Sequence, residues 1–499
     1  MRRSLFVAAW ASLPLLLFGA EITLTRDDFN ISQAGWKGAS YWAGKLSRPE
    51  IDGRKCLRVE STRENDRVYA RVYKWVPRVE FREGTAIRLS IRCKGRGTMT
   101  LGLLSYGGYR PNPVDLVPGQ PIALTGEMTD HQVEIVAPMA YDSMRPYIEL
   151  NGEAELVAEK FTMTVHSDPN IRISDEMMQV VSDPAQLRPF VFKTNLPGQT
   201  VSGSVWQDLK QTKFTARADA DGNVTVVPPP EFKERLAVHV YTGGVTGSAF
   251  ALRETAEECR RASEIAGRIK LSRPVRMLLI GDSLADFFRG YNFVDRISLG
   301  MNANNPGMFS FRNAGVGGDY LDRVQERLVG TMPGMKPAYR QEMYRDLFQD
   351  RYDLVLIELG PNDTRSNRSQ NYAVPLVPPE KQKRILTYVI NFLRRKTKAK
   401  IAVLSPSPSD PEANLRRAEN TPSGREFVLF GKPELVDAYD RVNREVCAAL
   451  NVDYIDILSV MRRDPDRASL YIDDGVHLSA KGGRVMAEVI LNYLKENFQ

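Results

Sequence analysis

From Leu271 to the C-terminus, short apolar segments alternate regularly with longer amphipathic segments. The apolar runs have the length of buried strands, and the amphipathic segments repeat their apolar residues at helical spacing. The apolar runs lie at 276–280, 309–313, 354–359, 400–405 and 452–457. The helical segments lie at about 319–330, 380–396, 434–450 and 479–497. This alternation predicts a three-layer α/β domain at residues 271–499, with a parallel sheet covered by helices on both faces.

The chain has 499 residues, which is too long for one compact core, and its first half has a different pattern. In residues 21–168, alternating runs are separated by clusters of Gly, Pro, Asn and Asp, which predicts an all-β sandwich or jelly roll. These runs lie at 56–59, 86–93, 99–104, 132–136, 147–150 and 161–165. The pattern of residues 169–250 predicts a smaller, immunoglobulin-like sandwich, with strands at 200–206, 213–218, 224–227 and 237–241. Residues 251–270 are expected to form a helix that connects to the α/β domain.

The layout of residues 21–168 resembles jelly-roll carbohydrate-binding modules and galactose-binding-like domains, without a specific shared motif. If they are exposed, six aromatic side chains of this region are candidates for stacking on sugar rings: Trp36, Tyr41, Trp42, Trp75, Tyr106 and Tyr109. The alternative is that most of them belong to the hydrophobic core.

The first twenty residues have the layout of a secretory signal peptide. Arg2 and Arg3 precede an apolar stretch at 5–18, and the small residues Gly19 and Ala20 follow it. The segment predicts a secreted or periplasmic protein, with no stable membrane insertion after cleavage near Ala20. An uncleaved membrane anchor is the alternative, although the stretch is short for a full span.

The net charge of +7 is spread along the chain and does not indicate nucleic-acid binding. The densest basic run, 381–400, falls on an amphipathic helix, where a solvated face is the simpler explanation. The four cysteines, at 56, 93, 259 and 447, lack the spacing of a metal site. Cys56 and Cys93 fall on strand positions that face opposite sides, so a disulfide between them is not favoured.

The stretch from Val275 to Phe288 places a serine at the junction between a strand and a helix. The apolar run ends at Gly281-Asp282, Ser283 follows, and Leu284, Phe287 and Phe288 recur at helical spacing. A serine at such a turn has free backbone N–H groups beside it, which suits a nucleophile. The alternative is that Ser283 only caps the helix.

Two further polar motifs follow predicted strands, at the same edge of the sheet. Residues 313–319 read Asn-Ala-Gly-Val-Gly-Gly-Asp, whose glycines permit close approach of a ligand to the backbone. Residues 360–363 read Gly-Pro-Asn-Asp, in which Asn362 can donate its side-chain amide to a developing oxyanion. Taken alone, either motif also fits an ordinary tight turn.

His477 is one of four histidines and the only one after residue 239. It lies in Asp473-Asp474-Gly475-Val476-His477, directly before the last predicted helix. Asp474 is near enough in sequence to contact the imidazole, and such a carboxylate fixes the tautomer and stabilises the imidazolium. Asp473 is the competing candidate for this contact.

The four motifs at 281–284, 313–319, 360–363 and 474–477 occur in the order of the four blocks of the SGNH/GDSL hydrolase family. Residues from about 271 to 499 therefore resemble this family, whose flavodoxin-like fold agrees with the alternation described above. None of the four motifs departs from the family pattern.

The resemblance implies a serine esterase that requires no cofactor and no metal. It implies that Ser283 is the nucleophile, with His477 as base and Asp474 as its orienting carboxylate. It also implies an oxyanion hole made of the N–H groups of Ser283 and Gly318 and the side-chain amide of Asn362.

An exported hydrolase preceded by β-domains is expected to remove O-acetyl groups from polysaccharide or oligosaccharide. One alternative is an esterase or lysophospholipase that acts on lipid or small acyl esters. Another is an inactive module that only binds glycan. Arginines in the loops 331–350, 364–379 and 406–433 are either contacts for acidic sugars or solvated surface charges: Arg365, Arg368, Arg416 and Arg417.

Overall fold

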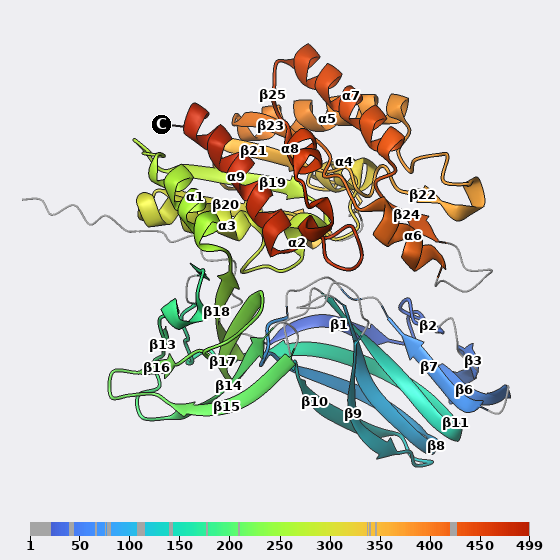
Figure 1. The fold of residues 1–499 in the computed structure, drawn as a ribbon. Helices are drawn as coiled ribbons and strands as arrows, with labels where there is room; N and C mark the ends of the chain where they lie inside the picture. Colours follow the sequence, from blue (N-terminus) through green and yellow to red (C-terminus); the bar gives the residue numbers. More distant parts are fainter. Residues whose placement is uncertain are drawn as a thin grey trace, which may run out of the picture.

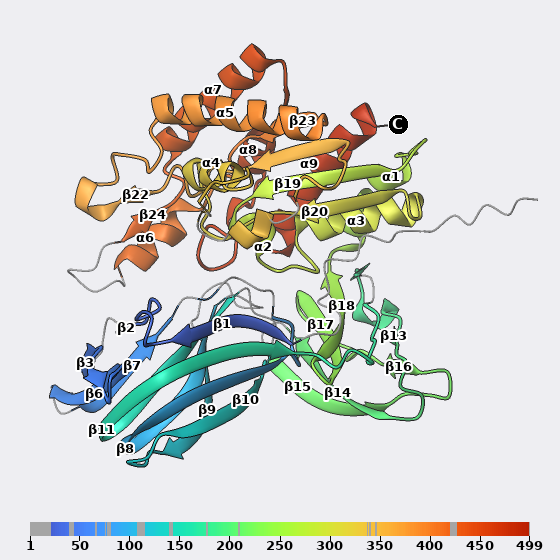
Figure 2. The ribbon, with the colours of Figure 1, turned by 180° about the vertical axis from the view of Figure 1, so that it is seen from behind.

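The computed structural model describes residues 21–498, except for 39–43, 65–66, 75, 77–80, 107–114, 139–142, 176–177, 208–209, 337, 339–340, 345–346 and 420–426. Figures 1 and 2 show an α/β region that lies over two β regions standing side by side. The expected signal segment 1–20 and the aromatic residues Tyr41, Trp42, Trp75 and Tyr109 lie outside the described residues. Within the described part of the chain, no helix combines the length and the apolar character that a membrane span requires.

The first region is all-β, as the sequence predicts. Nine strands form one sheet: β1 (Ile22–Asp28), β2 (Lys37–Gly38), β3 (Gly44–Ser47), β6 (Leu57–Glu64), β7 (Arg67–Tyr73), β8 (Ala86–Tyr106), β9 (Asp115–Ala123), β10 (Thr129–Val136) and β11 (Ser143–His166). Between β3 and β6 in the chain, the short strands β4 (Glu50–Ile51) and β5 (Arg54–Lys55) pair with each other.

In two places, a pair of strands that the sequence predicts separately is one long strand in the structure. The expected strands 86–93 and 99–104 both belong to β8, while 147–150 and 161–165 both belong to β11. These two strands pair antiparallel along nearly their whole length, with a register shift between Asn151 and Glu155. The glycines at 95, 97 and 152 look like turn signals in the sequence, but here they accompany an irregularity within continuous strands.

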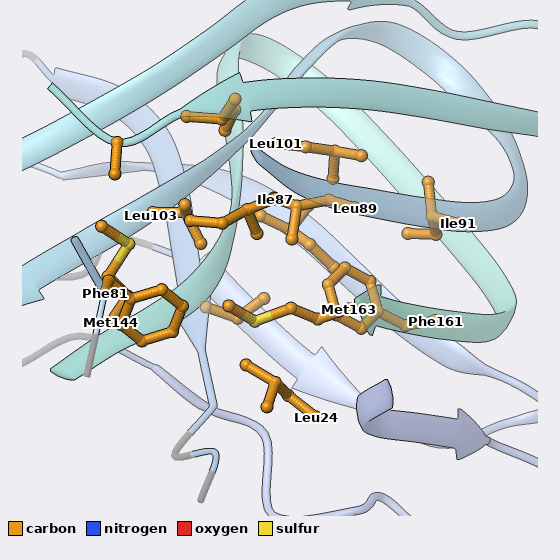
Figure 3. Close-up of a cluster of buried hydrophobic side chains, with 14 of the residues drawn as sticks. Leu24, Phe81, Ile87, Leu89, Ile91, Leu101, Leu103, Met144, Phe161 and Met163 are labelled. Carbon is orange, nitrogen blue, oxygen red and sulfur yellow. The ribbon is translucent and has the colours of Figure 1, made fainter. Parts of the chain in front are cut away.

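Both halves of β8 contribute side chains to one core. Figure 3 shows Ile87 and Leu89 from the first half beside Leu101 and Leu103 from the second. Because these are all odd-numbered positions, they lie on the same face of the strand.

Trp36 belongs to this core and is not a sugar-binding platform. Its side chain is 1% exposed, and its Nε1–H donates to Asp27 Oδ2 at 3.0 Å. Its ring meets that of Phe161 edge-on, with centroids 4.9 Å apart. Of the six aromatic residues proposed to stack on sugars, it is the one whose side chain the structure describes.

All four cysteines are free thiols. Cys56 and Cys93 are both buried, but only Cys93 belongs to the core cluster. Burial raises the pKa of the Cys93 thiol to about 12, so that it stays protonated.

The second region consists of two small sheets over a shared core. Five strands pair in the order β12 (Gln179–Val181), β18 (Val245–Arg253), β17 (Arg235–Thr242), β14 (Thr200–Gln207) and β15 (Lys210–Arg217). The second sheet pairs β13 (Phe190–Lys193) with β16 (Asn223–Val226), and a short 3₁₀ turn, η1 (Pro184–Gln186), lies between β12 and β13. The sequence predicted β14, β15, β16 and β17 and missed the other three strands, β12, β13 and β18. In β18 the small residues hide the alternation, although Gly243-Gly244 signals a hairpin.

The third region has a five-stranded parallel sheet, as expected. Its strands pair in the order β20 (Phe309–Asn313), β19 (Val275–Gly281), β21 (Leu354–Glu358), β23 (Lys400–Leu404) and β25 (Asp453–Ile455). The helices of this part are α1 (Ala256–Gly267), α2 (Ser283–Asp286), α3 (Phe293–Asn304), α4 (Leu321–Val329), α5 (Pro379–Thr397), α6 (Pro411–Glu419), α7 (Pro433–Leu450), α8 (Ile457–Arg463) and α9 (Ala480–Asn497). The remaining elements are η2 (Gln341–Tyr344), η3 (Arg368–Gln370), η4 (Arg467–Leu470) and the ribbon of β22 (Ser366–Asn367) with β24 (Val428–Leu429).

Alternate residues of β19 enter two separate cores, which makes the fold three-layered. Met277 and Leu279 pack with α3 and α9, whereas Leu278 and Ile280 pack with α4, α5 and α7. The strand β19 is the first strand of this sheet in the chain, and it lies between β20 and β21. The next strand, β20, pairs on one side of β19, and all later strands lie on its other side. Ligands of such sheets bind beyond the carboxyl end of the strand at this switch point, which is where Ser283 lies.

Candidate active site

Ser283 is the first residue of α2, and it does not cap the helix. Asp282 is the cap, because its Oδ1 accepts the N–H of Leu284 at 2.9 Å. The helix is a single turn: Phe287 is extended and Phe288 has a φ of +54°, so the helical face predicted through these residues does not form. Since Asp282 takes the capping role, the Ser283 hydroxyl is left for another partner.

That partner is His477, which lies between Ser283 and Asp474. His477 Nε2 is 2.9 Å from Ser283 Oγ, and its Nδ1 is 2.5 Å from Asp474 Oδ2. The ring of Phe287 stacks on the imidazole at 4.5 Å between centroids, with 20° between the planes. The side chain of Asp473, the competing candidate, is exposed, and the described residues show no bond between it and His477.

The loop itself holds Asp474 in place. Its Oδ1 accepts the N–H groups of Val476 at 2.8 Å and His477 at 2.9 Å, and Gly475 between them has a φ of +69°. Burial by itself raises the pKa of Asp474, but the bonds from His477 and Val476 outweigh it and hold the pKa below its usual value. Asp474 therefore carries its negative charge at neutral pH.

The expected oxyanion donors lie on three segments that meet here. Within the described part of the chain, neither the Ser283 nor the Gly318 N–H donates to another protein group, whereas the Gly317 N–H donates to Asp286 Oδ2 at 2.7 Å. Gly318 has a φ of +80°, which favours glycine at this position. The Asn362 side chain is 4% exposed and uses one amide hydrogen on Asp282 Oδ2 at 3.0 Å. Its second amide hydrogen is left for a ligand.

Buried carboxyl groups lie behind these donors. Burial raises the pKa of Asp282 to about 7 and that of Asp363 to about 8. The pKa of Glu358 is raised well above its usual range, first by burial and then by the charge of Asp282. Glu358 was not among the residues predicted from the sequence, although a charged residue inside an apolar strand was the available signal.

The profile of the GDSL-like Lipase/Acylhydrolase family matches residues 279–485, the part of the chain that contains these groups. Residues 279–485 form a GDSL-like lipase/acylhydrolase domain. This domain is accordingly a hydrolase domain of the GDSL esterase/lipase type.

Among curated relatives, the GDSL esterase/lipase WDL1 of Oryza sativa subsp. japonica is 24% identical over 195 residues, 38% of this chain and 74% of that protein. An acetylxylan esterase of Xylanibacter ruminicola is 24% identical over 223 residues, 44% of this chain and 43% of that protein. The match to GDSL esterase/lipase CPRD49 of Arabidopsis thaliana, 28% identical over 145 residues, spans 29% of this chain and 54% of that protein.

Two solved structures are also similar. A catalytic mutant of the acetylxylan esterase Axe2 of Geobacillus stearothermophilus is 18% identical, with a TM-score of 0.33, and covers 46% of this chain and 98% of its own. A family two carbohydrate esterase from Cellvibrio japonicus is 11% identical, with a TM-score of 0.31, and covers 96% of this chain and 98% of its own.

A pocket of the GDSL-like domain opens beside Ser283 and His477. Its lining includes the aromatic side chains of Phe287, Phe288 and Tyr291. One lining residue, Arg235, comes from β17 of the second β region. The pocket is therefore built by two regions of the chain.

Two adjacent residues of the second β region contact the segment that follows Ser283 and the segment that follows His477. Arg235 places its guanidinium 4.3 Å from the centroid of the Phe288 ring and donates to the carbonyl oxygen of Leu478 at 3.3 Å. Glu234 Oε1 accepts the N–H of Ala480, the first residue of α9, at 2.6 Å. The segment that follows His477 is thus hydrogen-bonded to Arg235 of β17 and to Glu234, the residue before β17. Figure 2 shows this β region directly below the GDSL-like domain.

Replacing Glu234 with alanine is expected to lower kcat for 4-nitrophenyl acetate by about tenfold. The substitution removes the acceptor of the Ala480 N–H, and a hydrogen bond to a charged group contributes about 1.5–3 kcal/mol. Glu234→Gln retains an acceptor oxygen and is expected to restore most of the rate. Glu231→Ala, an exposed neighbour, is the control. Equal rates for Glu234→Ala and Glu231→Ala would show that β17 does not position the histidine loop.

Replacing Asn362 with alanine is expected to lower kcat by about 10²–10³-fold with little change in KM. The loss corresponds to one oxyanion donor, about 2.7–4 kcal/mol of the barrier. Steady-state hydrolysis of 4-nitrophenyl acetate measures it, and thermal unfolding checks that the fold persists. Asn367→Ala, an exposed position of β22, is the matched control. A variant that keeps more than a tenth of the wild-type kcat would remove Asn362 from the oxyanion hole.

Proposed function

We propose that the chain is an exported serine esterase that removes O-acetyl groups from polysaccharide or oligosaccharide. Ser283 is the nucleophile, His477 the general base and acid, and Asp474 the carboxylate that orients the histidine. The observation that carries this proposal is the continuous set of contacts from Asp474 through His477 to Ser283, at 2.5 and 2.9 Å. Hydrogen bonds of this length between nucleophile, base and orienting carboxylate are the geometry of activated serine enzymes.

In the first half of the reaction, His477 Nε2 takes the proton of Ser283 as Oγ attacks the ester carbonyl carbon. Asp474 accepts the Nδ1–H, which leaves Nε2 unprotonated and ready to act as base. The oxyanion accepts hydrogen bonds from the N–H groups of Ser283 and Gly318 and from Asn362. When the tetrahedral intermediate collapses, His477 donates its proton to the departing alcohol.

In the second half, water replaces the alcohol. His477 removes a proton from the water, the resulting nucleophile attacks the acyl-serine carbonyl, and the carboxylic acid leaves as Ser283 recovers its proton. The same three donors stabilise the second oxyanion. Every proton in this cycle moves through His477 Nε2.

Three observations support carbohydrate ester as the substrate. Two all-β regions precede the GDSL-like domain, and one of them supplies Arg235 to the lining of the pocket. One curated relative, 24% identical over 223 residues, is an acetylxylan esterase. The layout of residues 1–20 supports export, which would give the enzyme access to polysaccharide outside the cell.

A second candidate is an esterase of lipid or small acyl esters. The observation that favours it is the apolar wall formed by Phe287, Phe288 and Tyr291, which suits an acyl chain. The two candidate functions are distinguished by measuring acetate release from a panel of acetylated polysaccharides and, beside it, the hydrolysis of 4-nitrophenyl esters with acyl chains of two to twelve carbons. Preference for long acyl chains with no acetate release from any polymer would overturn the carbohydrate proposal.

A further inference from the structure

Asp286 is a fully buried carboxylate that the proposed reaction does not use. It is the last residue of α2, three positions after Ser283, and its side chain is 0% exposed. Its Oδ2 accepts the N–H of Gly317 at 2.7 Å. Its Oδ1 accepts the Nε–H of Arg289 at 3.1 Å and an Nη2–H of the same residue at 2.8 Å. Complete burial of an aspartate is rare and depends on such partners.

The glycine that Asp286 holds belongs to a tight turn with the proposed oxyanion donor at its centre. The Asp319 N–H donates to the carbonyl oxygen of Val316 at 3.0 Å and closes the turn around Gly317 and Gly318. Gly318 has a φ of +80°, as the third residue of a type II turn does. The peptide that joins the two glycines carries the Gly318 N–H. The direction of this N–H therefore depends on how the ends of the turn are held.

Charged side chains hold both ends of this turn. At the end that leads into α4, Asp319 forms a fully buried pair with Arg327. At the other end, Asp286 accepts the Gly317 N–H. The contact with Asp286 connects the turn to the helix that begins with Ser283. It therefore fixes the two backbone donors of the proposed oxyanion hole relative to each other.

Arg289 allows a carboxylate to lie beside the oxyanion hole. An unpaired negative charge at this place would repel the oxyanion. Arg289 supplies the compensating charge, and its Nη2 also donates to the carbonyl oxygen of Gly315 at 3.1 Å. The same loop packs closely on α2, because a Cβ added to Gly315 would lie 2.7 Å from the Cβ of Ala285. The charged pair and this packing together hold the glycine-rich loop against α2.

We propose that Asp286 is a positioning residue of the esterase, which acts through Gly317 to hold the Gly318 N–H where the oxyanion forms. The inference rests on the proposed esterase function and adds a residue that acts through the backbone. Oxyanion donors are effective only within a narrow range of distances, so a small shift of the turn reduces catalysis. Asp282 holds Asn362 in a similar way. Two aspartates of one segment thus hold two of the three proposed donors.

The isosteric variant Asp286→Asn tests this role. Both partners of the carboxylate are donors, so an amide oxygen can accept from only one of them. The bond from Arg289 is charge-assisted and takes that oxygen, which turns the NH₂ group toward the Gly317 N–H. For 4-nitrophenyl acetate, we expect kcat to fall by about tenfold to a hundredfold, less than the loss of an entire donor, while KM changes by no more than about twofold.

A second variant and an inhibitor separate positioning from a loss of stability. In Asp286→Asn/Arg289→Gln, the glutamine oxygen can accept from the asparagine NH₂, which returns the asparagine oxygen to Gly317. We expect this double variant to be faster than Asp286→Asn, although it carries one more substitution. A trifluoromethyl ketone forms a reversible adduct with the serine and places its oxygen in the oxyanion hole. Its affinity for Asp286→Asn is expected to fall by the same factor as kcat.

Asp440→Asn is the matched control. Asp440 is a buried aspartate of α7 that pairs with Arg444 at 2.9 Å and accepts the hydroxyl of Tyr454. The substitution removes the charge of a buried pair away from the site, so kcat is expected to stay within about twofold of wild type. Thermal unfolding reports the stability of each variant.

Three results would overturn the positioning role and leave the esterase intact: equal kcat for Asp286→Asn and Asp440→Asn, unchanged affinity for the ketone, or a double variant slower than Asp286→Asn. An Asp286→Asn protein that does not fold would make the role of Asp286 structural and would also overturn it. A wild-type protein that hydrolyses neither 4-nitrophenyl acetate nor acetylated polysaccharide would instead refute the proposed function.

Discussion

Ser283→Ala is expected to lower kcat for 4-nitrophenyl acetate by about a millionfold, to the level set by binding and the oxyanion donors alone. Loss of the nucleophile removes the acyl-enzyme route, and in serine hydrolases the loss of serine or of its histidine base costs about the same amount. His477→Ala is therefore expected to match Ser283→Ala. The double variant should be no slower than either single one, because the two residues act as a unit.

The fold is expected to survive the loss of the Ser283 hydroxyl. Its recorded side-chain bond is the one to His477, and the helix cap belongs to Asp282, so a change in Tm of no more than a few degrees is expected. Covalent labelling with a fluorophosphonate, followed by intact mass, provides an independent measurement: wild type gains one label and Ser283→Ala gains none. Ser202→Ala, an exposed serine of β14, is the control. A labelled or active Ser283→Ala protein would refute the assignment of the nucleophile.

The α/β region was predictable because its signals are local and repeated. Apolar runs such as 276–280 and 354–359 match β19 and β21 within a residue or two, since a strand buried on both faces must be apolar throughout. The polar motifs that follow parallel strands necessarily meet at one edge of the sheet. For this reason the sequence predicts that Ser283 and Asn362 lie close together, whereas His477 follows no strand and was grouped with them through the resemblance of the four motifs to one family. In the structure, His477 Nε2 is 2.9 Å from Ser283 Oγ, and Asn362 donates to Asp282, the residue before Ser283.

What the sequence missed depends on contacts between distant segments. Asp282 and Ser283 are equally good capping residues by composition, and only the backbone geometry shows that Asp282 takes the role. Arg235 of β17 and Glu234, the residue before it, reach the site from more than 240 residues before His477, and no local pattern indicates such packing. Trp36 was a candidate for sugar binding because an aromatic residue near a turn looks the same in sequence whether it is buried or exposed.

Asp474→Asn is expected to lower kcat by about 10⁴-fold while leaving the loop in place. An asparagine Oδ1 can still accept the N–H groups of Val476 and His477, so the turn keeps its bonds. The amide NH₂ would then face His477 Nδ1 and donate to it, which forces the ring proton onto Nε2. An imidazole protonated at Nε2 cannot take the proton of Ser283, and the imidazolium formed during the reaction loses its counter-charge.

The neighbouring residue provides a matched control for this prediction. Asp473→Asn removes the same charge one position earlier, from an exposed side chain, and is expected to retain more than half of the wild-type kcat. Because the pKa of Asp474 is held below its usual value, its carboxylate stays ionised through the mildly acidic range, and the 10⁴-fold difference should persist from pH 6 to pH 8. If Asp473→Asn were the slower of the two variants, the orienting role would belong to Asp473, and the contact between Asp474 and His477 would be structural only.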